Sequence, residues 1–413
     1  MTNKPQVIVV GGGVIGCAVA YELAKRSVDV LLLDKSLPGR ATSASAGGLW
    51  PLGEAIGLGC GVIYSATQAG DVETPTGQEY SHVLPTPFRD FLLKSNGRFP
   101  SLADELAKLG GVDFEYDPGV GLLFLVYHMH DEHFVYHVAK SLPDESKLKI
   151  LSPPEARQLE PELTDQFEAA VLIEGEHQVN PMLLAEAYKR AAVALGARFE
   201  HDVRVSGLIC QGDRVTGVEV DDRHVSADVV VNAAGAWAGQ LAATAQIDLP
   251  IYPVRGQVVL TDALPRIMNA CLSTSSCYML QKKHGEVLIG STTEEVGFDV
   301  SLTTEAVTTL CRGAVRAVPK LRHVGVKRIW AGLRPGTPDE LPILGPVQGL
   351  AGYFNATGGF RTGIVASPLT AQVVAQSVVG ETTDVPIEPF LQSRFQNNSA
   401  QVLNEQVAGS KHE

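Results

Sequence analysis

The stretch VIVVGGGVIG, residues 7–16, decides the fold of this chain. The β-branched run before the glycines predicts a buried strand over Gln6–Val10, and apolar residues at helical spacing predict a helix over Val14–Arg26. A second strand is expected over Asp29–Leu33. Strand, glycine loop, helix and strand in this order predict a βαβ unit, and hence an α/β chain with a Rossmann-like domain.

The glycines in this stretch have the spacing G-x-G-x-x-G. Gly11 permits a tight turn, Gly13 lets the backbone approach a pyrophosphate, and Gly16 lets the helix pack closely on the strand. The helix start adds unbonded N–H groups and the positive end of a dipole. Asp34 ends the second strand and can accept hydrogen bonds from both ribose hydroxyls, while its charge disfavours the 2′-phosphate of NADP. The motif predicts a dinucleotide site; a glycine turn without a ligand is the alternative.

Three further segments separate FAD from NAD. Residues 40–43 (RATS) supply an arginine and two hydroxyls, and residues 46–48 (AGG) supply bare backbone along which a long dinucleotide can lie. A nicotinamide-dependent dehydrogenase has no use for such a run at that place. Residues 233–237 (AAGAW) follow another buried strand, Val229–Asn232, and again let backbone approach a ligand, although a tight core turn is the alternative. Together these segments favour FAD.

Composition excludes several classes of protein. The 413 residues suffice for two or three domains, and 45% hydrophobic with 19% charged residues is typical of a folded chain. The net charge of −13 and the lack of a basic run argue against nucleic-acid binding. The six cysteines form no Cys-x-x-Cys pair, so we expect reduced thiols and neither zinc nor an iron–sulfur cluster. The apolar stretch 362–380 contains Pro368 and two glutamines, which favours a packed helix, and no transmembrane segment is predicted.

Segments of different character alternate along the chain. Strands expected over residues 252–261, 276–282, 286–293 and 328–333 alternate as in an antiparallel sheet and cannot continue the parallel one. We therefore expect a discontinuous FAD-binding domain made of residues 1–83, 150–240 and 331–395. The remaining residues, 84–149 and 241–330, are expected to form a substrate domain of the α+β type. Residues 396–413 are expected to form a flexible tail.

The motifs together resemble those of a known family. They are GGGVIG (11–16), RATSASAGGLW (40–50), NAAGAW (232–237), CYMLQKKHGEVLIGSTTE (277–294), AGLRPGTPDELPILGP (331–346) and GGFRTGI (358–364). Over roughly residues 5–395 the chain resembles the FAD-dependent amine and amino-acid oxidoreductases, which include D-amino-acid oxidase, glycine oxidase and sarcosine oxidase. Within this family it is most similar to the catalytic flavoprotein subunits of bacterial hydrogen cyanide synthase, and also to subunits of opine and D-hydroxyproline dehydrogenases.

The resemblance implies a p-hydroxybenzoate-hydroxylase-like arrangement, in which FAD lies extended through the Rossmann-like domain and its ring faces the antiparallel sheet. Val205 is expected at the adenine end and residues 358–364 at the pyrimidine edge of the ring. Gly332 stands where sarcosine oxidase has the cysteine that attaches its flavin, so non-covalent FAD is expected. The residues expected to bind the cofactor are Gly11, Gly13, Val14, Ile15, Gly16, Asp34, Lys35, Arg40, Thr42, Ser43, Ala46, Gly47, Gly48, Leu49, Val205, Ala234, Gly235, Trp237, Gly358, Arg361, Thr362, Gly363 and Ile364.

Two further residues match the substrate site of the family. Arg334 matches the arginine that holds the substrate carboxylate in glycine and D-amino-acid oxidases, and Tyr278 matches the tyrosine that assists it. A guanidinium forks onto a carboxylate and thereby fixes which face of the α-carbon meets the flavin. The resemblance implies hydride transfer from a small amino acid to flavin N5 and formation of an imine, without a strong general base. A structural arginine and an ordinary strand tyrosine are the alternatives. No metal site is expected, and the histidines of residues 128–137 are placed at a solvated helix start.

The substrate and the electron acceptor stay open at this point. Glycine, oxidised as in a hydrogen cyanide synthase, is favoured; a D-amino acid, D-hydroxyproline or an opine is the alternative, followed by a non-catalytic electron-transfer subunit. Gly359 replaces a histidine common in relatives, which leaves the shape of the pocket open. The excursion Pro51–Val83 predicts docking of other electron-transfer subunits, a second flavoprotein and an iron–sulfur protein; a lid in an oxygen-using oxidase is the alternative. A cytoplasmic protein, or one held at the inner membrane through such partners, is expected.

Overall fold

A six-stranded sheet forms around the N-terminal strand. The computed structural model describes residues 6–59, 84–127 and 148–395. In sheet order the strands are β18 (Ile343–Pro346), β19 (Tyr353–Thr357), β12 (Val229–Asn232), β1 (Val7–Val10), β2 (Val30–Asp34) and β8 (Arg198–His201). The pairs from β19 to β8 are parallel, and β18 is antiparallel to β19. Neighbouring strands of this sheet therefore come from distant parts of the sequence.

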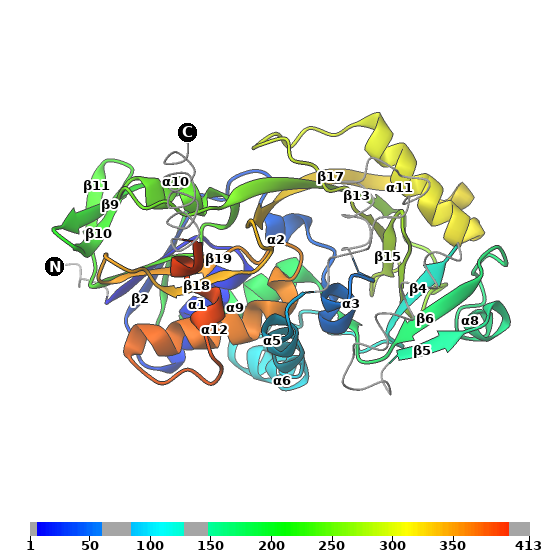
Figure 1. Cartoon of the computed structure of the whole chain (residues 1–413), viewed down its shortest axis with the longest axis horizontal. Coiled ribbons are helices and arrows are strands. Elements are labelled where there is room, and N and C mark those ends of the chain that lie inside the picture. The colour runs from blue at the N-terminus through cyan, green and yellow to red at the C-terminus, as the bar shows by residue number, and fades with distance from the viewer. Residues whose placement is uncertain (1–5, 60–83, 128–147, 396–413) are drawn as a thin grey trace, which may run out of the picture.

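Helices cover one face of this sheet (Figure 1). They are α1 (Val14–Lys25), α9 (Pro181–Ala194) and α12 (Gly363–Val379), flanked by α5 (Thr86–Asn96) and α6 (Phe99–Gly110). The predicted packed helix at residues 362–380 is α12, which is buried along most of its length. Pro368 has no N–H for the carbonyl of Ile364, and the hydroxyl of Ser367 donates to that carbonyl at 2.8 Å instead. This replacement lets the helix continue through the proline.

The other face packs against a three-stranded antiparallel sheet and a short helix. The strands are β9 (Val205–Gln211), β10 (Arg214–Val220) and β11 (Arg223–Ser226), and the helix is α10 (Ala238–Ala243). The hairpin of β9 and β10 confirms the pair predicted for residues 205–220. Apolar side chains of β1 and β2 alternate between the two covered faces, as a parallel sheet buried on both sides requires.

An eight-stranded sheet makes up the second half of the molecule (Figure 1). Its order is β17 (Val326–Gly336), β13 (Tyr252–Thr261), β16 (Val287–Gly290), β15 (Tyr278–Gln281), β14 (Cys271–Ser273), β4 (Leu122–Val126), β6 (Ala169–Ile173) and β5 (Leu148–Leu151). All neighbours are antiparallel except β14 and β4. The predicted antiparallel sheet is therefore confirmed. Helix α11 (Thr304–Ala317) packs on one face, and the other face turns toward Trp50 and Leu52.

Short elements complete the described chain. They are α2 (Ala41–Ala44), β3 (Gly48–Leu49), α3 (Pro51–Ala55), α8 (Pro153–Leu159), β7 (His177–Gln178) and the 3₁₀ turns Gly235–Trp237, Pro319–His323, Glu388–Phe390 and Gln392–Phe395. The five cysteines within the described residues are free, in agreement with reduced thiols. Within the same residues no helix is long and apolar enough to cross a membrane.

Two segments pack differently from the predicted domain division. Helices α5 and α6, placed in the substrate domain as part of residues 84–149, insert Phe88, Phe91 and Phe99 into the core formed by α1, α9 and α12. Strand β6, assigned to the FAD-binding domain, pairs with β4 and β5 of the eight-stranded sheet. Helical periodicity shows that a helix has an apolar face but does not identify its partner. The division into two domains stays a proposal.

Some predictions concern residues outside the described part of the chain. They are the excursion from residue 60 to Val83, the helix expected over Asp131–Lys140 with its neighbouring histidines, and the tail 396–413.

We predict that Gly16→Ala destabilises the fold. A Cβ at this position would lie 1.8 Å from the carbonyl oxygen of Gly11, and the clashing atom cannot shift easily because it belongs to the backbone. The free energy of unfolding of the apoprotein should fall by about 3 kcal/mol, as for overpacking without relief. Gly97→Ala is the matched control, because φ is −60° there and the nearest atoms lie 3.7 Å away. Equal denaturant midpoints for the two variants would contradict this prediction.

Candidate active site

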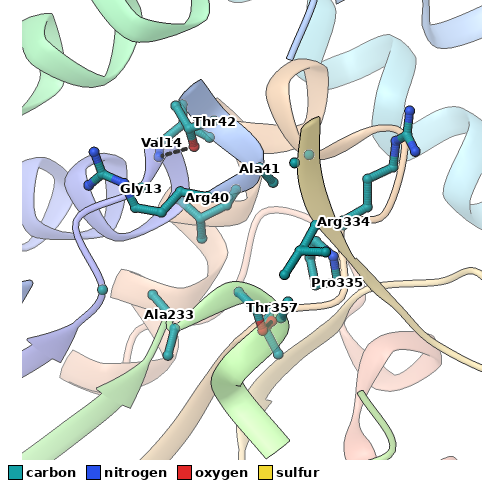
Figure 2. Close-up of a pocket in the computed structure, with 18 of the residues that line it drawn as sticks. Gly13, Val14, Arg40, Ala41, Thr42, Ala233, Arg334, Pro335 and Thr357 are labelled. Atoms are coloured by element: carbon teal, nitrogen blue, oxygen red, sulfur yellow. Dashed lines mark hydrogen bonds between the residues drawn. The ribbon is translucent and has the colours of Figure 1, made fainter. Parts of the chain in front are cut away.

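A cavity of about 590 Å³ is lined by residues of both large sheets. Figure 2 shows Gly13 and Val14 on one side of it and Arg334 and Pro335 of β17 on the other, with Ala41 between them. Ligand pockets commonly have volumes of roughly 300–1,000 Å³. The cavity therefore joins the predicted nucleotide loop and the predicted substrate arginine in one space.

Bare backbone forms the nucleotide end of the cavity. Gly11 has φ +109°, and a Cβ there would lie 2.3 Å from the carbonyl oxygen of Ala233. A Cβ on Gly13 would lie 3.2 Å from Oγ1 of Thr42. The N–H of Val14, in the first turn of α1, donates to this Thr42 oxygen at 3.0 Å (Figure 2). The predicted roles of the glycines thus have a geometric basis, because side chains would fill the space next to the helix N-terminus.

Asp34 connects the end of β2 to the glycine loop. Its Oδ1 accepts from the N–H of Gly12 at 2.9 Å, and its Oδ2 accepts from Nη1 of Arg40 at 2.8 Å and from Oγ of Ser36 at 3.1 Å. The side chain is buried, whereas Arg40 is about one-third exposed. Sequence analysis placed Arg40 along an extended dinucleotide but did not foresee that it neutralises Asp34.

Lys282 does not line the cavity but holds the backbone of Ala46, which does. Its Nζ donates to the backbone oxygens of Ala46 and Val179 and to Oε1 of Gln178. Ala46 belongs to the AGG run, in which Gly47 has φ +83° and its carbonyl accepts a hydrogen bond from the N–H of Val179 at 2.9 Å. Burial lowers the pKa of Lys282 to about 8. Sequence analysis missed this residue, since a lysine near a hairpin turn carries no signal of a buried contact.

Arg334 and Tyr278 stand on the cavity face of the eight-stranded sheet. Nη1 of Arg334 donates to the carbonyl of Thr292 at 3.1 Å and Nη2 to Oγ of Ser291 at 2.5 Å. The guanidinium lies over Gly256, where a Cβ would be 2.4 Å from Nη1. The ring of Tyr278 is buried, and its centroid lies 5.4 Å from that of Trp50 in an edge-on contact. The two predicted substrate residues therefore line the same part of the cavity.

A buried group of charges borders the site near the start of α12. Nε of Arg361 donates to Oε2 of Glu54 at 3.1 Å, and Nη2 of Arg361 lies 2.9 Å from Oε2 of Glu340. The side chains of Arg361 and Glu54 are each 3% exposed, and both line the cavity. Burial of a charge requires a partner, and here a cation has two anionic ones. Sequence analysis named Arg361 but missed Glu54.

Most residues predicted to bind the cofactor line this cavity. They are Gly11, Gly13, Val14, Ile15, Asp34, Lys35, Arg40, Thr42, Ala46, Gly47, Gly48, Val205, Ala234, Gly235, Trp237, Arg361, Gly363 and Ile364. Helix α12 begins at Gly363, so its N-terminus faces the cavity as expected. The roles of the individual residues toward a cofactor stay predictions.

The other predicted residues do not line the cavity. Gly16 lies behind the loop against Gly11, which fits its predicted packing role. Ser43 turns its hydroxyl to the carbonyl of Arg40, and Leu49 is fully buried in the core. Gly358, with φ +78°, forms a turn against Thr337 and Pro342, and the Thr362 hydroxyl donates to the carbonyl of Gly359. These five residues therefore face the protein in this structure, and their roles toward a cofactor stay predictions.

Gly256 was missed although the sequence contains a signal for it. An isolated glycine inside a strand weakens the strand and marks a close approach by another group. Gly256 lies in the middle of β13, and the same reasoning applies to Gly290 at the end of β16, over which the Tyr278 ring lies.

The chain is similar in sequence and in structure to known proteins. The model of the family of FAD dependent oxidoreductases (DAO) matches residues 6–377. The chain belongs to this family. Hydrogen cyanide synthase subunit HcnC of Pseudomonas protegens is 44% identical over 406 residues, covering 96% of this chain and 97% of the relative. Glycine oxidase of Pseudomonas putida is 30% identical, with 93% and 97% covered. The crystal structure of glycine oxidase from Geobacillus kaustophilus matches with a TM-score of 0.82 at 29% identity. The match covers 95% of this chain and 99% of the glycine oxidase chain.

The residues of the cavity fit FAD, the cofactor of this family. The space left by Gly11 and Gly13 lies beside the N-terminus of α1, where a pyrophosphate would meet backbone N–H groups. Asp34 and Val205, expected near the adenosine, and Arg334 and Tyr278, expected at the substrate, all line this cavity. Gly332 has no side chain through which a flavin could be attached, and a Cβ there would lie 2.2 Å from the Cβ of Ala44. The FAD-dependent assignment made from the sequence is confirmed by the family.

We predict that Asp34→Asn weakens FAD binding. The change removes the charge that pairs with Arg40 while the side chain keeps its shape. The Kd for FAD should rise about tenfold or more, because hydrogen bonds to charged groups contribute about 1.5–3 kcal/mol. Titration of the apoprotein with FAD, followed by quenching of flavin fluorescence, measures the effect.

Asp29→Asn serves as the control for this change. Asp29 precedes the other end of β2 and pairs with the partly exposed Arg198 at 3.0 Å. Its Kd for FAD should equal that of the wild type, and an unchanged Kd for Asp34→Asn would contradict the assignment of Asp34 to the ribose.

Proposed function

We propose that this FAD-dependent oxidoreductase oxidises the C–N bond of a small amino acid to the imine, with glycine as the favoured substrate. The observation that carries the proposal is the position of Arg334, whose guanidinium lines the same cavity as the glycine loop of α1. An amino-acid dehydrogenase needs a cationic group in this cavity to bind the carboxylate of its substrate. A subunit that only conveys electrons has no need of it.

Arg334 would hold the substrate by its carboxylate. A guanidinium has five N–H donors in a rigid plane, and the contacts to Ser291 and Thr292 hold that plane in one orientation. A forked bond to the carboxylate then fixes which hydrogen of the α-carbon points into the cavity. FAD, when bound, supplies the acceptor for the hydride that leaves this carbon. Orientation of this kind is a large part of catalysis when no bond to the protein forms.

The remaining residues of the pocket limit its size and exclude water. Tyr278 and Trp50 are both buried, and their rings meet edge to face beside the strand that carries Tyr278. Tyr278 would assist Arg334 at the carboxylate, and its position in the same cavity supports this role. The amine must lose its proton before hydride leaves, and a buried apolar wall favours the neutral amine. This chemistry requires no strong general base.

Glycine is favoured because of the relatives as well as the pocket. A hydrogen cyanide synthase subunit is 44% identical over almost the whole chain, and glycine oxidase is 30% identical. The bulky rings of Trp50 and Tyr278 reduce the space for a side chain on the α-carbon. A D-amino acid, D-hydroxyproline or an opine is the second candidate substrate class.

The electron acceptor forms a further part of the proposal. The 44% identical relative is named as one subunit of a synthase. We propose that this chain likewise transfers electrons to partner subunits, a second flavoprotein and an iron–sulfur protein, in the cytoplasm or at the inner membrane. Most of the segment expected to dock them lies outside the described residues. Fast peroxide formation by the isolated chain in air would contradict the need for partners.

Anaerobic bleaching of the yellow protein tests the proposed function. Glycine, sarcosine, D-amino acids, hydroxyprolines and opines are added separately, and flavin absorbance is followed. We expect glycine to bleach the chromophore. Failure of every compound in the panel would overturn the proposal.

We predict that Arg334→Ala slows this bleaching. Loss of the anchor should lower kcat/KM more than a hundredfold, equivalent to about 3 kcal/mol when a buried charge loses its partner. Arg328→Ala is the control, because Arg328 lies on the same strand but is exposed, over the ring of Trp330. Equal rates for Arg334→Ala and the wild type would remove the catalytic assignment.

We predict that Gly256→Ala impairs substrate binding through Arg334. The new Cβ would meet the end of a flexible side chain, so the guanidinium moves and the strand persists. The KM should rise about tenfold or more, since a displacement of about 1 Å at a reacting group has effects of this size. In the background of Arg334→Ala the same change should have no further effect on kcat/KM. A full additional loss in the double variant would contradict this reading of Gly256.

A further inference from the structure

The loop from Ser291 to Thr303, called the 291–303 loop below, connects β16 to α11. It contains the STTE motif (291–294) and the GFDVS motif (297–301), and the proposed function uses only Ser291 and Thr292 of them. Its first residues contact Arg334, through Oγ of Ser291 and the carbonyl of Thr292. The base of the loop therefore holds the guanidinium that is proposed to bind the substrate.

Strand β13 binds the base of this loop through two buried side chains. Arg255 is 4% exposed, and its guanidinium donates from Nε and Nη2 to Oε2 of Glu294. Gln257 is fully buried and donates to Oε1 of Glu294 at 2.8 Å. The hydroxyl of Thr292 also donates to Oε1 of Glu294. One carboxylate thus connects the strand to the residue whose carbonyl accepts from Arg334.

The same arginine also holds the far part of the loop. Nη1 of Arg255 donates to Oδ2 of Asp299 at 2.6 Å and to Oγ of Ser301 at 3.1 Å. Asp299 itself is about half exposed. Arg255 therefore joins two sections of the loop that lie five residues apart, with Glu294 at the base and Asp299 near the tip.

The tip of the loop reaches the nucleotide-binding half of the molecule. The ring of Phe298 lies on Trp237, with centroids 5.5 Å apart. The side chain of Val300 lies against Gly39, where a Cβ would be 2.5 Å from Cγ1. Trp237 and the neighbour of Gly39, Arg40, both line the FAD cavity. The loop spans from the substrate arginine to the wall of the cofactor cavity.

We infer that Glu294 and Asp299 are positioning residues with separable tasks, Glu294 for the substrate arginine and Asp299 for retention of FAD. The task of Glu294 rests on the proposed function of Arg334, whereas the task of Asp299 rests on the cofactor alone. Glu294 orients Thr292, and Thr292 orients Arg334. Asp299 keeps Phe298 and Val300 on the cavity wall.

The charges of both residues are maintained near neutral pH. Burial opposes ionisation of Glu294, but hydrogen bonds from Arg255, Thr292 and Gln257 outweigh it and lower its pKa. Hydrogen bonds from Ser301 lower the pKa of Asp299, with Arg255 adding to the effect. An amide at either position removes the charge and keeps the shape. Arg255 retains one carboxylate partner in each variant, so neither leaves a buried cation unpaired.

The experiment measures two binding constants for Glu294→Gln, Asp299→Asn and the control Glu295→Gln, which changes the exposed neighbour. One is the Kd for FAD, from fluorescence quenching on titration of the apoprotein. The other is the Kd for glycolate in FAD-saturated protein, from the perturbation of flavin absorbance. Glycolate carries the carboxylate of glycine but cannot be oxidised as an amine, so turnover does not enter.

We expect opposite patterns in the two variants. Glu294→Gln should raise the Kd for glycolate about tenfold through displacement of Arg334 and leave the Kd for FAD at the wild-type value. Asp299→Asn should raise the Kd for FAD about three- to fivefold, the size of a partly exposed ion pair, and leave the Kd for glycolate unchanged. Glu295→Gln should change neither constant.

Two outcomes overturn the inference. Wild-type constants in both variants would show that Glu294 and Asp299 position nothing, and parallel loss of both ligands in both variants would show general destabilisation. Absence of any glycolate effect in the wild type, together with no bleaching by amino acids, would instead overturn the proposed function and with it the task of Glu294. The FAD titration then still decides the task of Asp299.

Discussion

The contact between helix α1 and strand β1 is the constraint on which the rest of the structure depends. The helix approaches so closely that the α-carbon of Gly16 faces the carbonyl of Gly11 with no room for another carbon. This approach brings the N-terminus of α1 to the edge of the sheet, beside the carboxylate of Asp34 at the end of β2. The negative side chain and the positive helix end then border one narrow space. A ligand with both hydroxyl groups and phosphates finds complementary partners there.

Glycines in the eight-stranded sheet likewise leave room for a close approach by neighbouring groups. Gly256 leaves room for the guanidinium of Arg334, and Gly290 leaves room for the ring of Tyr278. Both groups therefore lie close to strand backbone, and both line the cavity. The missing side chain of Gly256 lets Arg334, the anchor proposed for the substrate, approach the sheet. Buried partners on the opposite side of β13, Arg255 and Gln257, hold the neighbouring loop in register with this anchor.

Local patterns in the sequence were sufficient for most elements and for the outline of the site. Strand β12 and strand β13 have the predicted bounds, and helix α9 begins at the predicted Pro181, because each has a clear period or boundary signal. The glycine loop, Asp34 and Arg334 meet in one cavity as expected. The prediction that these residues meet depended on the family motifs, because periodicity alone does not show that Asp34 and Arg334 line one cavity.

Long-range pairing was not predictable from local patterns. The ion pair of Glu54 with Arg361 spans 307 positions, and Glu54 does not stand out in its own segment. Helix α11 was missed, although its amphipathic face packs on the second sheet. The sequence also does not show which members of a motif turn inward: the Ser43 hydroxyl donates to the carbonyl of Arg40, and Leu49 is fully buried.

The strand order of the six-stranded sheet has a consequence for how the chain acquires its shape during synthesis. Strand β1 emerges first, yet its neighbour β12 ends at Asn232 and the next strand, β19, ends at Thr357. Until β12 leaves the ribosome, one edge of β1 lacks its native partner, and exposed edges of this kind favour aggregation. Assembly of the nucleotide-binding surface is therefore a late event dominated by distant pairings, which are slow to form.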